Sequence, residues 1–246
     1  MPDFTIVSFN SHAGLQARRN GVCEPYDLAE VLRGFDADVI VLQESWSPDG
    51  DDAAVRAVAS ELGATLFEKP FGRAKLDPWP HIPREHRSAT GVVGIAILSH
   101  LPALLVGQLA VGRVAGDPTP ERGGLHVQLD VGGTPVELVG VHLSSRLPYG
   151  PPVQLRRLAP QLPPPDRPTI VAGDCNFWGP GVLGFLSGTG PKGWRRAVRG
   201  RTWPASRPHS QIDHVLVRGG IESLGGEVLP AVGSDHRPVR ARLRVR

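Results

Sequence analysis

The stretch TIVAGDCN, residues 169–176, joins a short apolar run to an abrupt polar end. Its first half is typical of a buried strand, and Asp174 and Asn176 follow where the strand stops. The same pattern recurs earlier in the chain, where Asn10 follows TIVSF and Glu44 follows VIVLQ. Further polar ends are His142 after the run 139–141, Asp213 with His214 after 211–212, and Asp235 with His236 before RPVR. A structural role does not need so many polar side chains at strand ends, so we expect a functional site.

Apolar runs of strand length alternate with Gly- and Pro-rich turns over the whole chain. The runs predicted to be strands are residues 4–9, 38–43, 92–98, 104–111, 125–131, 136–143, 169–172, 212–217 and 239–245. Helical spacing of apolar residues predicts helices at 26–35, 51–62 and 153–159. The stretches 70–90 and 177–210 lack periodicity and are predicted to be loops, the first either a substrate lid or an ordered surface loop.

The predicted strands fall into two groups, roughly before and after residue 150. The four runs between residues 92 and 143 suggest an antiparallel meander. Because no repeat or linker divides the chain, we expect a single domain over residues 1–246. Two packed sheets flanked by helices satisfy this pattern, which predicts an α/β (α+β) sandwich.

The composition is that of a globular protein. Hydrophobic residues make up 40% and charged residues 21% of the 246 residues, which excludes a disordered chain or a coiled coil. The formal net charge of +3 is too small to indicate a nucleic-acid partner by itself.

The N-terminal residues and the cysteines indicate a compartment. Residues 1–10 lack a basic segment followed by an apolar one, and no apolar run approaches the roughly 18 residues that span a bilayer. We therefore expect neither secretion nor membrane insertion. Cys23 and Cys175 are too few for a disulfide framework and lack metal-ligand spacing, which excludes structural zinc and predicts a cytoplasmic location.

Each polar strand end also has a simple structural explanation. Asn10 alone suits a turn or a cap, Glu44 a solvated loop and His142 a hydrogen-bonded core or surface histidine. Asp174 after a glycine suits a tight turn, and Asp235 with its neighbour suits a cap of the last strand. Together, however, these carboxylates and amides are the hard oxygen ligands that magnesium or manganese prefers, which points to a divalent cation.

The order of these segments resembles a known family. The set SFN, LQES, VHLSS, AGDCN, QIDHV and GSDHRPV, at residues 8–10, 42–45, 141–145, 172–176, 211–215 and 233–239, is similar to the endonuclease/exonuclease/phosphatase superfamily. The resemblance covers residues 5–243, and its strongest parts are GDCN and SDHRPV. It implies a DNase I-like fold, a four-layer sandwich of two mixed sheets with helices outside.

The resemblance also implies a metal-dependent phosphoric ester hydrolase in which water attacks phosphorus. Glu44 would be the principal ligand of Mg²⁺, or alternatively Mn²⁺, with Asn10 and Asp235 near the same ion. A cation that neutralises a non-bridging phosphate oxygen lowers the barrier to attack on an anionic phosphoester.

The remaining matched residues would carry the catalytic roles. Asp174 and Asn176 would hold the phosphate and the attacking water, and His236 would contact the phosphate and share in proton transfer. Asp213 would orient His236, as carboxylates do in other acid–base pairs. His142 matches the histidine of the nuclease, sphingomyelinase and inositol-phosphatase branches, whereas abasic-site endonucleases carry tyrosine there, which disfavours abasic-site activity.

The substrate is less constrained than the chemistry. Arg195 and Arg199, with Trp194 and Trp203, form a basic and aromatic segment that suits a nucleic-acid backbone, or else a solvated arginine face over core tryptophans. We predict a monomeric, nuclease-type phosphodiesterase. The alternatives are a phosphatase or phosphodiesterase for a small molecule or lipid head group, and a non-catalytic binding member of the family.

Overall fold

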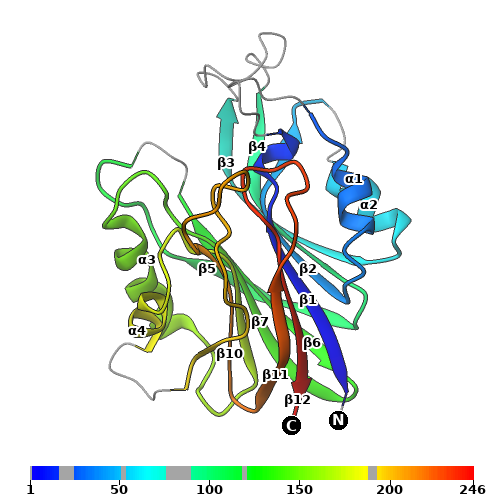
Figure 1. Cartoon of the computed structure of the whole chain (residues 1–246), viewed down its shortest axis with the longest axis vertical. Coiled ribbons are helices and arrows are strands. Elements are labelled where there is room, and N and C mark those ends of the chain that lie inside the picture. Colours follow the sequence, from blue (N-terminus) through cyan, green and yellow to red (C-terminus); the bar gives the residue numbers. More distant parts are fainter. Residues whose placement is uncertain (1, 17–24, 51–53, 76–89, 118–120, 188–192) are drawn as a thin grey trace.

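The apolar runs form two six-stranded sheets that pack face to face, with helices on the outer sides (Figure 1). The computed structural model describes residues 2–16, 25–50, 54–75, 90–117, 121–187 and 193–246. Within these ranges, no helix combines the length and apolar character needed to cross a membrane.

The first sheet combines strands from both ends of the chain. In spatial order it contains β11 (Ile221–Val228), β12 (Val239–Val245), β1 (Asp3–Asn10), β2 (Val39–Pro48), β4 (Thr90–Ser99) and β3 (Thr65–Lys75). Strands β1 and β2 are parallel and the other neighbours are antiparallel, so the sheet is mixed.

The second sheet comes from the middle of the chain. In spatial order it contains β5 (Ala103–Ala110), β6 (Gly123–Val131), β7 (Thr134–His142), β8 (Thr169–Asp174), β10 (Asp213–Arg218) and the two-residue β9 (Arg195–Arg196). Strands β7 and β8 are parallel, and the rest of this sheet is antiparallel.

The helices cover the outer faces of the two sheets. They are α1 (Leu28–Arg33), α2 (Ala54–Glu61), α3 (Gly150–Leu158) and α4 (Gly181–Ser187), with 3₁₀ turns η1 (His12–Gly14) and η2 (Ala159–Gln161). Helices α1 and α2 pack on the first sheet, whereas α3 and α4 pack on the second (Figure 1).

Several strands are apolar at consecutive positions because both faces of each sheet are covered, one by the other sheet and one by helices. On β1, Ile6 packs in the cluster between the sheets, and its neighbour Val7 packs in the cluster under α1 and α2. On β7, Leu138 and Val139 alternate in the same way between the central cluster and the one under α3 and α4. The three apolar clusters confirm the predicted four-layer sandwich.

Two predictions about sheet membership were wrong. Only β5, β6 and β7 form the antiparallel meander, because β4 pairs with β2 and β3 in the other sheet. The sheets also do not divide at residue 150, since β11 and β12 return to the first sheet beside β1. Long-range pairing of this kind leaves no local signal in the chain.

Strands β3, β9 and β11 and helix α4 lie in stretches that the sequence did not predict as regular structure. Residues 70–75 continue β3, which tolerates Pro70 because β3 is an edge strand with an irregular register at that point. The rest of the expected loop, residues 76–89, lies outside the described residues. Helix α4 is short and contains Gly184, and β11 contains Gly225 and Gly226, so glycine obscured both elements.

Candidate active site

The polar strand ends meet at one end of the sandwich. Pairing of β7 with β8 places His142 beside Asp174, and pairing of β10 with β8 places Asp213 opposite the same aspartate. All three continue the inward-facing positions of their strands. From the first sheet, Asn10 Nδ2 donates a hydrogen bond to Asp174 Oδ2 at 3.0 Å. The two sheets are therefore joined through site residues that the sequence separates widely.

The backbone around Asp174 explains the glycine and asparagine that flank it. Gly173 has φ +150°, and a Cβ there would lie 1.9 Å from the carbonyl oxygen of Val141, so no larger residue fits. Asn176 adopts a left-handed φ of +46°, and its backbone N–H donates to Asp174 Oδ1 at 2.8 Å. Its side-chain amide donates to the Leu143 carbonyl at 3.0 Å. The GDCN motif is thus a tight turn that holds one buried carboxylate.

Glu44 reaches the site through a break in the β2 ladder. The register of β2 against β4 shifts between Gln43 and Ser45, and Glu44 adopts a left-handed φ of +52°. Ser11 Oγ donates to the Glu44 carbonyl at 3.1 Å and supports this bulge. The side chain of Glu44 is 27% exposed and lines the site, in keeping with the concentration of backbone strain at functional positions.

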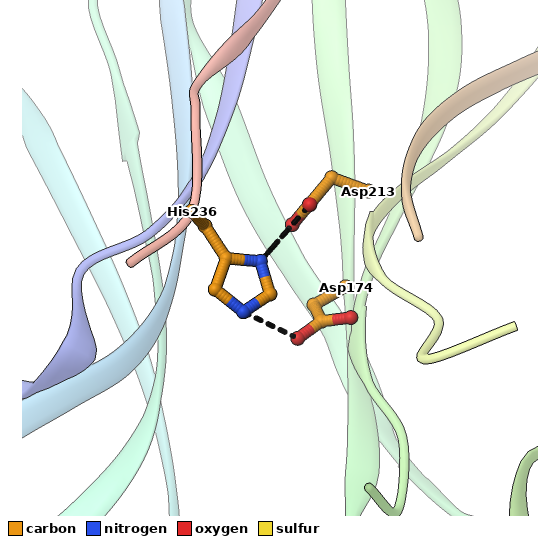
Figure 2. Close-up of side chains that lie close together, drawn as sticks. All are labelled: Asp174, Asp213 and His236. Carbon is orange, nitrogen blue, oxygen red and sulfur yellow. Dashed lines mark hydrogen bonds and ion pairs between the residues drawn. The ribbon is translucent and has the colours of Figure 1, made fainter. Parts of the chain in front are cut away.

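His236 is held between two carboxylates (Figure 2). Its Nδ1 lies 3.1 and 3.0 Å from the two carboxylate oxygens of Asp213, and its Nε2 lies 3.8 Å from Asp174 Oδ2. Burial by itself lowers the pKa of His236, but the charges of Asp213 and Asp174 raise that pKa well above its ordinary value. The imidazole is therefore a buried cation, oriented by one carboxylate and facing another.

Contacts that the sequence did not reveal fix the loop that carries His236. Ser234 Oγ donates to the Asn10 carbonyl at 2.7 Å and accepts from the His236 backbone N–H at 3.1 Å. Trp203 Nε1 donates to Asp235 Oδ2 at 3.3 Å. Asn10 and Trp203 are far in sequence from the loop that they hold, so only the fold shows these contacts.

His142 has a different partner, Arg122, which the sequence did not single out among its many arginines. The guanidinium Nη1 lies 3.1 Å from His142 Nδ1, and because a guanidinium only donates, Nδ1 must accept. The proton then sits on Nε2, which lies 3.7 Å from Asp174 Oδ2 and 3.8 Å from Glu44 Oε1. Burial, followed by the charges of Arg122 and His236, lowers the pKa of His142 well below its ordinary value. His142 is a neutral N–H donor.

Asp174 lies at the centre of these contacts. Burial raises its pKa, the charge of His236 opposes this, and the carboxylate of Asp213 adds to it, which gives a pKa of about 7. A carboxylate with such a pKa is poised to exchange a proton near neutrality. Nearby positive charge would favour its ionised form.

The oxygen donors at the site fit a hard divalent cation. Glu44 and Asp174 both approach His142 Nε2, and Asp235 Oδ1 lies 4.0 Å from His236 Nε2. Asp174, Asp213 and His236 also have ligand atoms within 4.8 Å of one another. Both oxygens of Asp213 contact His236, however, so we interpret that cluster as an acid–base pair and not as the main ligand set. The assignment of Glu44, Asn10 and Asp235 as metal ligands stays a prediction.

The site opens into a cleft of about 500 Å³, a size typical of small-ligand pockets. The predicted site residues that line it are Glu44, Asp174, Asn176, Asp235 and His236. Asn10, His142 and Asp213 lie beneath them, each no more than 2% exposed.

The predicted arginine segment lies elsewhere. Neither Arg195 nor Arg199 is among the residues that line the cleft, and Arg195 Nη2 donates to the Ile221 carbonyl at 2.7 Å. Trp194 is buried, with the Arg218 guanidinium 4.4 Å from its ring centroid, as expected for a core tryptophan. The predicted role of Arg195 and Arg199 in substrate binding stays untested.

Comparisons with known proteins agree with this geometry. The endonuclease/exonuclease/phosphatase family model matches residues 7–236. An endonuclease/exonuclease/phosphatase from Beutenbergia cavernae is 22% identical, with a TM-score of 0.74 over 100% of this chain and 72% of that one. The human nocturnin catalytic domain, with bound sulfate anion, is 16% identical, with a TM-score of 0.69 over 100% and 94%. Humanized D. rerio TDP2 is 18% identical, with a TM-score of 0.64 over 99% of each chain.

At these identities the solved structures show the fold alone, and no curated protein gives a significant match. The family model covers nearly all of the chain. The chain therefore belongs to the endonuclease/exonuclease/phosphatase family, and it is a metal-dependent phosphoric ester hydrolase.

Proposed function

We propose that this protein is a magnesium-dependent phosphodiesterase of the nuclease type, in which water attacks phosphorus. The observation that carries the proposal is the convergence of Asp174 and the charged His236–Asp213 pair beside Glu44 in one cleft. A phosphodiester is anionic, and a protonated imidazole next to hard oxygen ligands suits an anionic substrate. Manganese is the alternative ion.

The metal would be held by Glu44, Asn10 and Asp235, and it would neutralise a non-bridging phosphate oxygen. Asp174 would orient the attacking water and accept its proton, a role that its pKa of about 7 suits. Asn10 Nδ2 donates a hydrogen bond to Asp174 Oδ2, and the Asn176 backbone N–H donates one to Oδ1. These two hydrogen bonds would keep the carboxylate oriented toward the attacking water.

The two histidines would both contact the phosphate, His236 as a cation and His142 as a neutral ring. His236, held as a cation by Asp213, would bind a phosphate oxygen and supply a proton during departure of the leaving alcohol. His142, a neutral N–H donor fixed by Arg122, would donate a hydrogen bond to the charge that develops on phosphorus-bound oxygen.

The first experiment asks whether the protein is an enzyme. Hydrolysis of bis-p-nitrophenyl phosphate with Mg²⁺ should be lost on chelation and should fall at least about 100-fold in Asp174→Asn, which keeps the shape of the side chain. Asp130→Asn, near the end of β6 where the side chain accepts from Gly133 N, is the matched control and should leave turnover unchanged. Absence of metal-dependent turnover would favour a non-catalytic binding protein.

The second experiment identifies the substrate. Single-stranded DNA, duplex DNA, RNA, sphingomyelin and inositol phosphates are compared under identical conditions, and a nuclease should prefer one of the nucleic acids. If Arg195 and Arg199 bind the backbone, Arg195→Ala with Arg199→Ala should weaken cleavage and reduce its salt dependence. Preference for a lipid or an inositol phosphate would overturn the nuclease assignment while leaving the chemistry intact.

A further inference from the structure

Trp178 is a large apolar side chain that the catalytic roles leave unused. It is 72% exposed, more than any other large hydrophobic side chain in the described part of the chain, and it lines the cleft. It lies two residues after Asn176 and four after Asp174, so the turn that holds the catalytic carboxylate also carries this ring.

The exposure of Trp178 is imposed by an anchored backbone. Phe177 packs edge-to-face on Phe185 with ring centroids 5.2 Å apart, and its carbonyl lies 2.9 Å from His214 Nε2. On the other side, Gly179 has a left-handed φ of +50°, and its N–H donates to the carbonyl of residue 211 at 3.3 Å. With both neighbours held, the chain presents the indole to solvent at a defined position beside the catalytic groups.

The other tryptophan of the cleft is engaged differently. The Trp203 ring is half-buried, packs edge-to-face on His209 at 5.5 Å, and donates its N–H to Asp235. Its contacts are within the protein, whereas most of the Trp178 ring faces water. The cleft lining also contains five other apolar side chains: Leu147, Pro148, Pro151, Phe177 and Ile212.

We infer that Trp178 is the stacking surface for a nucleobase of the substrate, one sugar away from the phosphate that is cleaved. This inference rests on the proposed phosphodiesterase function. Any of the nucleobases can stack on an exposed indole, because every base has a flat π-face. A cleft of about 500 Å³ with polar catalytic groups and an apolar, aromatic lining accommodates a phosphate and a ring together. The aryl group of an aryl phosphate ester is also a flat ring, so the experiment must distinguish stacking of a nucleobase from stacking of an aryl group.

The test uses two chromogenic diesters. Thymidine 5′-(4-nitrophenyl phosphate) carries a base, whereas methyl 4-nitrophenyl phosphate carries only the aryl leaving group. Trp178→Ala should raise KM for the thymidine ester about tenfold with little change in kcat, and Trp178→Phe should restore most of the loss. Both variants should hydrolyse the methyl ester as the wild type does.

The control and the contrary outcomes are distinct. Tyr149→Ala removes another exposed aromatic side chain, 52% exposed and outside the cleft lining, and should leave KM unchanged for both esters. Equal KM of Trp178→Ala and wild type on the thymidine ester would overturn the stacking inference alone. A similar loss on both esters would mean that Trp178 contacts the aryl ring, which also overturns it. No hydrolysis of either ester by the wild type would overturn the proposed function instead.

Discussion

Two buried histidines face Asp174, and they differ in what holds the opposite ring nitrogen. The Nδ1 of His236 lies against the Asp213 carboxylate, whereas the Nδ1 of His142 accepts from the Arg122 guanidinium. Burial lowers the pKa of both rings, but only His236 has carboxylate charges that reverse this effect. The same residue type therefore becomes a cation on one side of Asp174 and a neutral donor on the other.

A third buried histidine, His126, shows that a buried histidine–carboxylate pair does not by itself make an active site. His126 Nε2 lies 2.8 Å from Glu137 Oε2 on the outer face of the second sheet, and both side chains are buried. Burial raises the pKa of Glu137, but hydrogen bonds from Gln128, His126 and Arg167 lower it further than burial raises it. This pair does not line the cleft. What distinguishes His236 is the second nitrogen, which faces Asp174 where the cleft opens.

The largest expected effect on kcat comes from removing the carboxylate that holds His236. Asp213→Asn removes the charge that keeps the imidazole protonated and oriented, so kcat should fall on the order of 10³-fold with the fold intact. Glu137→Gln makes the matching change in the pair outside the cleft and should leave kcat within about twofold. Steady-state kinetics on one diester measures both variants. Retention of kcat within tenfold in Asp213→Asn would contradict the role of this pair.

A smaller effect is expected on the His142 side. Arg122→Met keeps the bulk but lets His142 exchange tautomers, so kcat should fall on the order of 10–100-fold, as for partners that orient a catalytic or ligating group. Arg122→Lys retains a donor and should recover part of the loss. Nitrogen-15 chemical shifts of the His142 ring should show Nε2–H in the wild type and a mixture in Arg122→Met. An unchanged tautomer in that variant would show that Arg122 does not fix it.

The smallest effect is on stability, and its sign distinguishes the two histidines. The folded-state pKa of His142 lies below 6.5, so its unfolded state gains the proton first and its contribution to stability falls as pH drops below 6.5. The folded-state pKa of His236 lies above 6.5, so its contribution is complete below pH 6.5 and is lost as pH rises through that pKa. Each slope is at most about 1.4 kcal/mol per pH unit.

Urea unfolding of the chelated protein between pH 5 and 8 measures these slopes. The free energy of unfolding of the wild type, relative to His142→Gln, should decrease as the solution becomes more acidic. Relative to His236→Gln it should increase over the same change. Differences that move in the same direction for both variants would show that the two rings share one protonation behaviour.

Much of the candidate site was predictable because most of its residues lie at or next to the ends of apolar strands. Asn10 and Asp174 are the last residues of buried strands, whereas β2 continues past Glu44, which lies at a bulge where the sequence predicted the strand to end. Parallel or directly paired strands bring such positions together. Arg122 was not predictable, since it lies just before β6, next to Gly123 and Gly124, and resembles any other arginine in the chain. Its contact with His142 depends on the β6–β7 pairing, which places the strand ends beside each other.

Residue type and order along the chain were enough to predict the family and the layered fold and to nominate the candidate site residues, because these depend on local patterns of polarity. The protonation of each histidine and the exposure of Trp178 depended on folding, because each arises from groups that the chain alone does not bring together. Asn10 and Asp174, 164 residues apart, share one hydrogen bond. A pKa reports burial and charge in three dimensions, and neither can be read from neighbours in sequence.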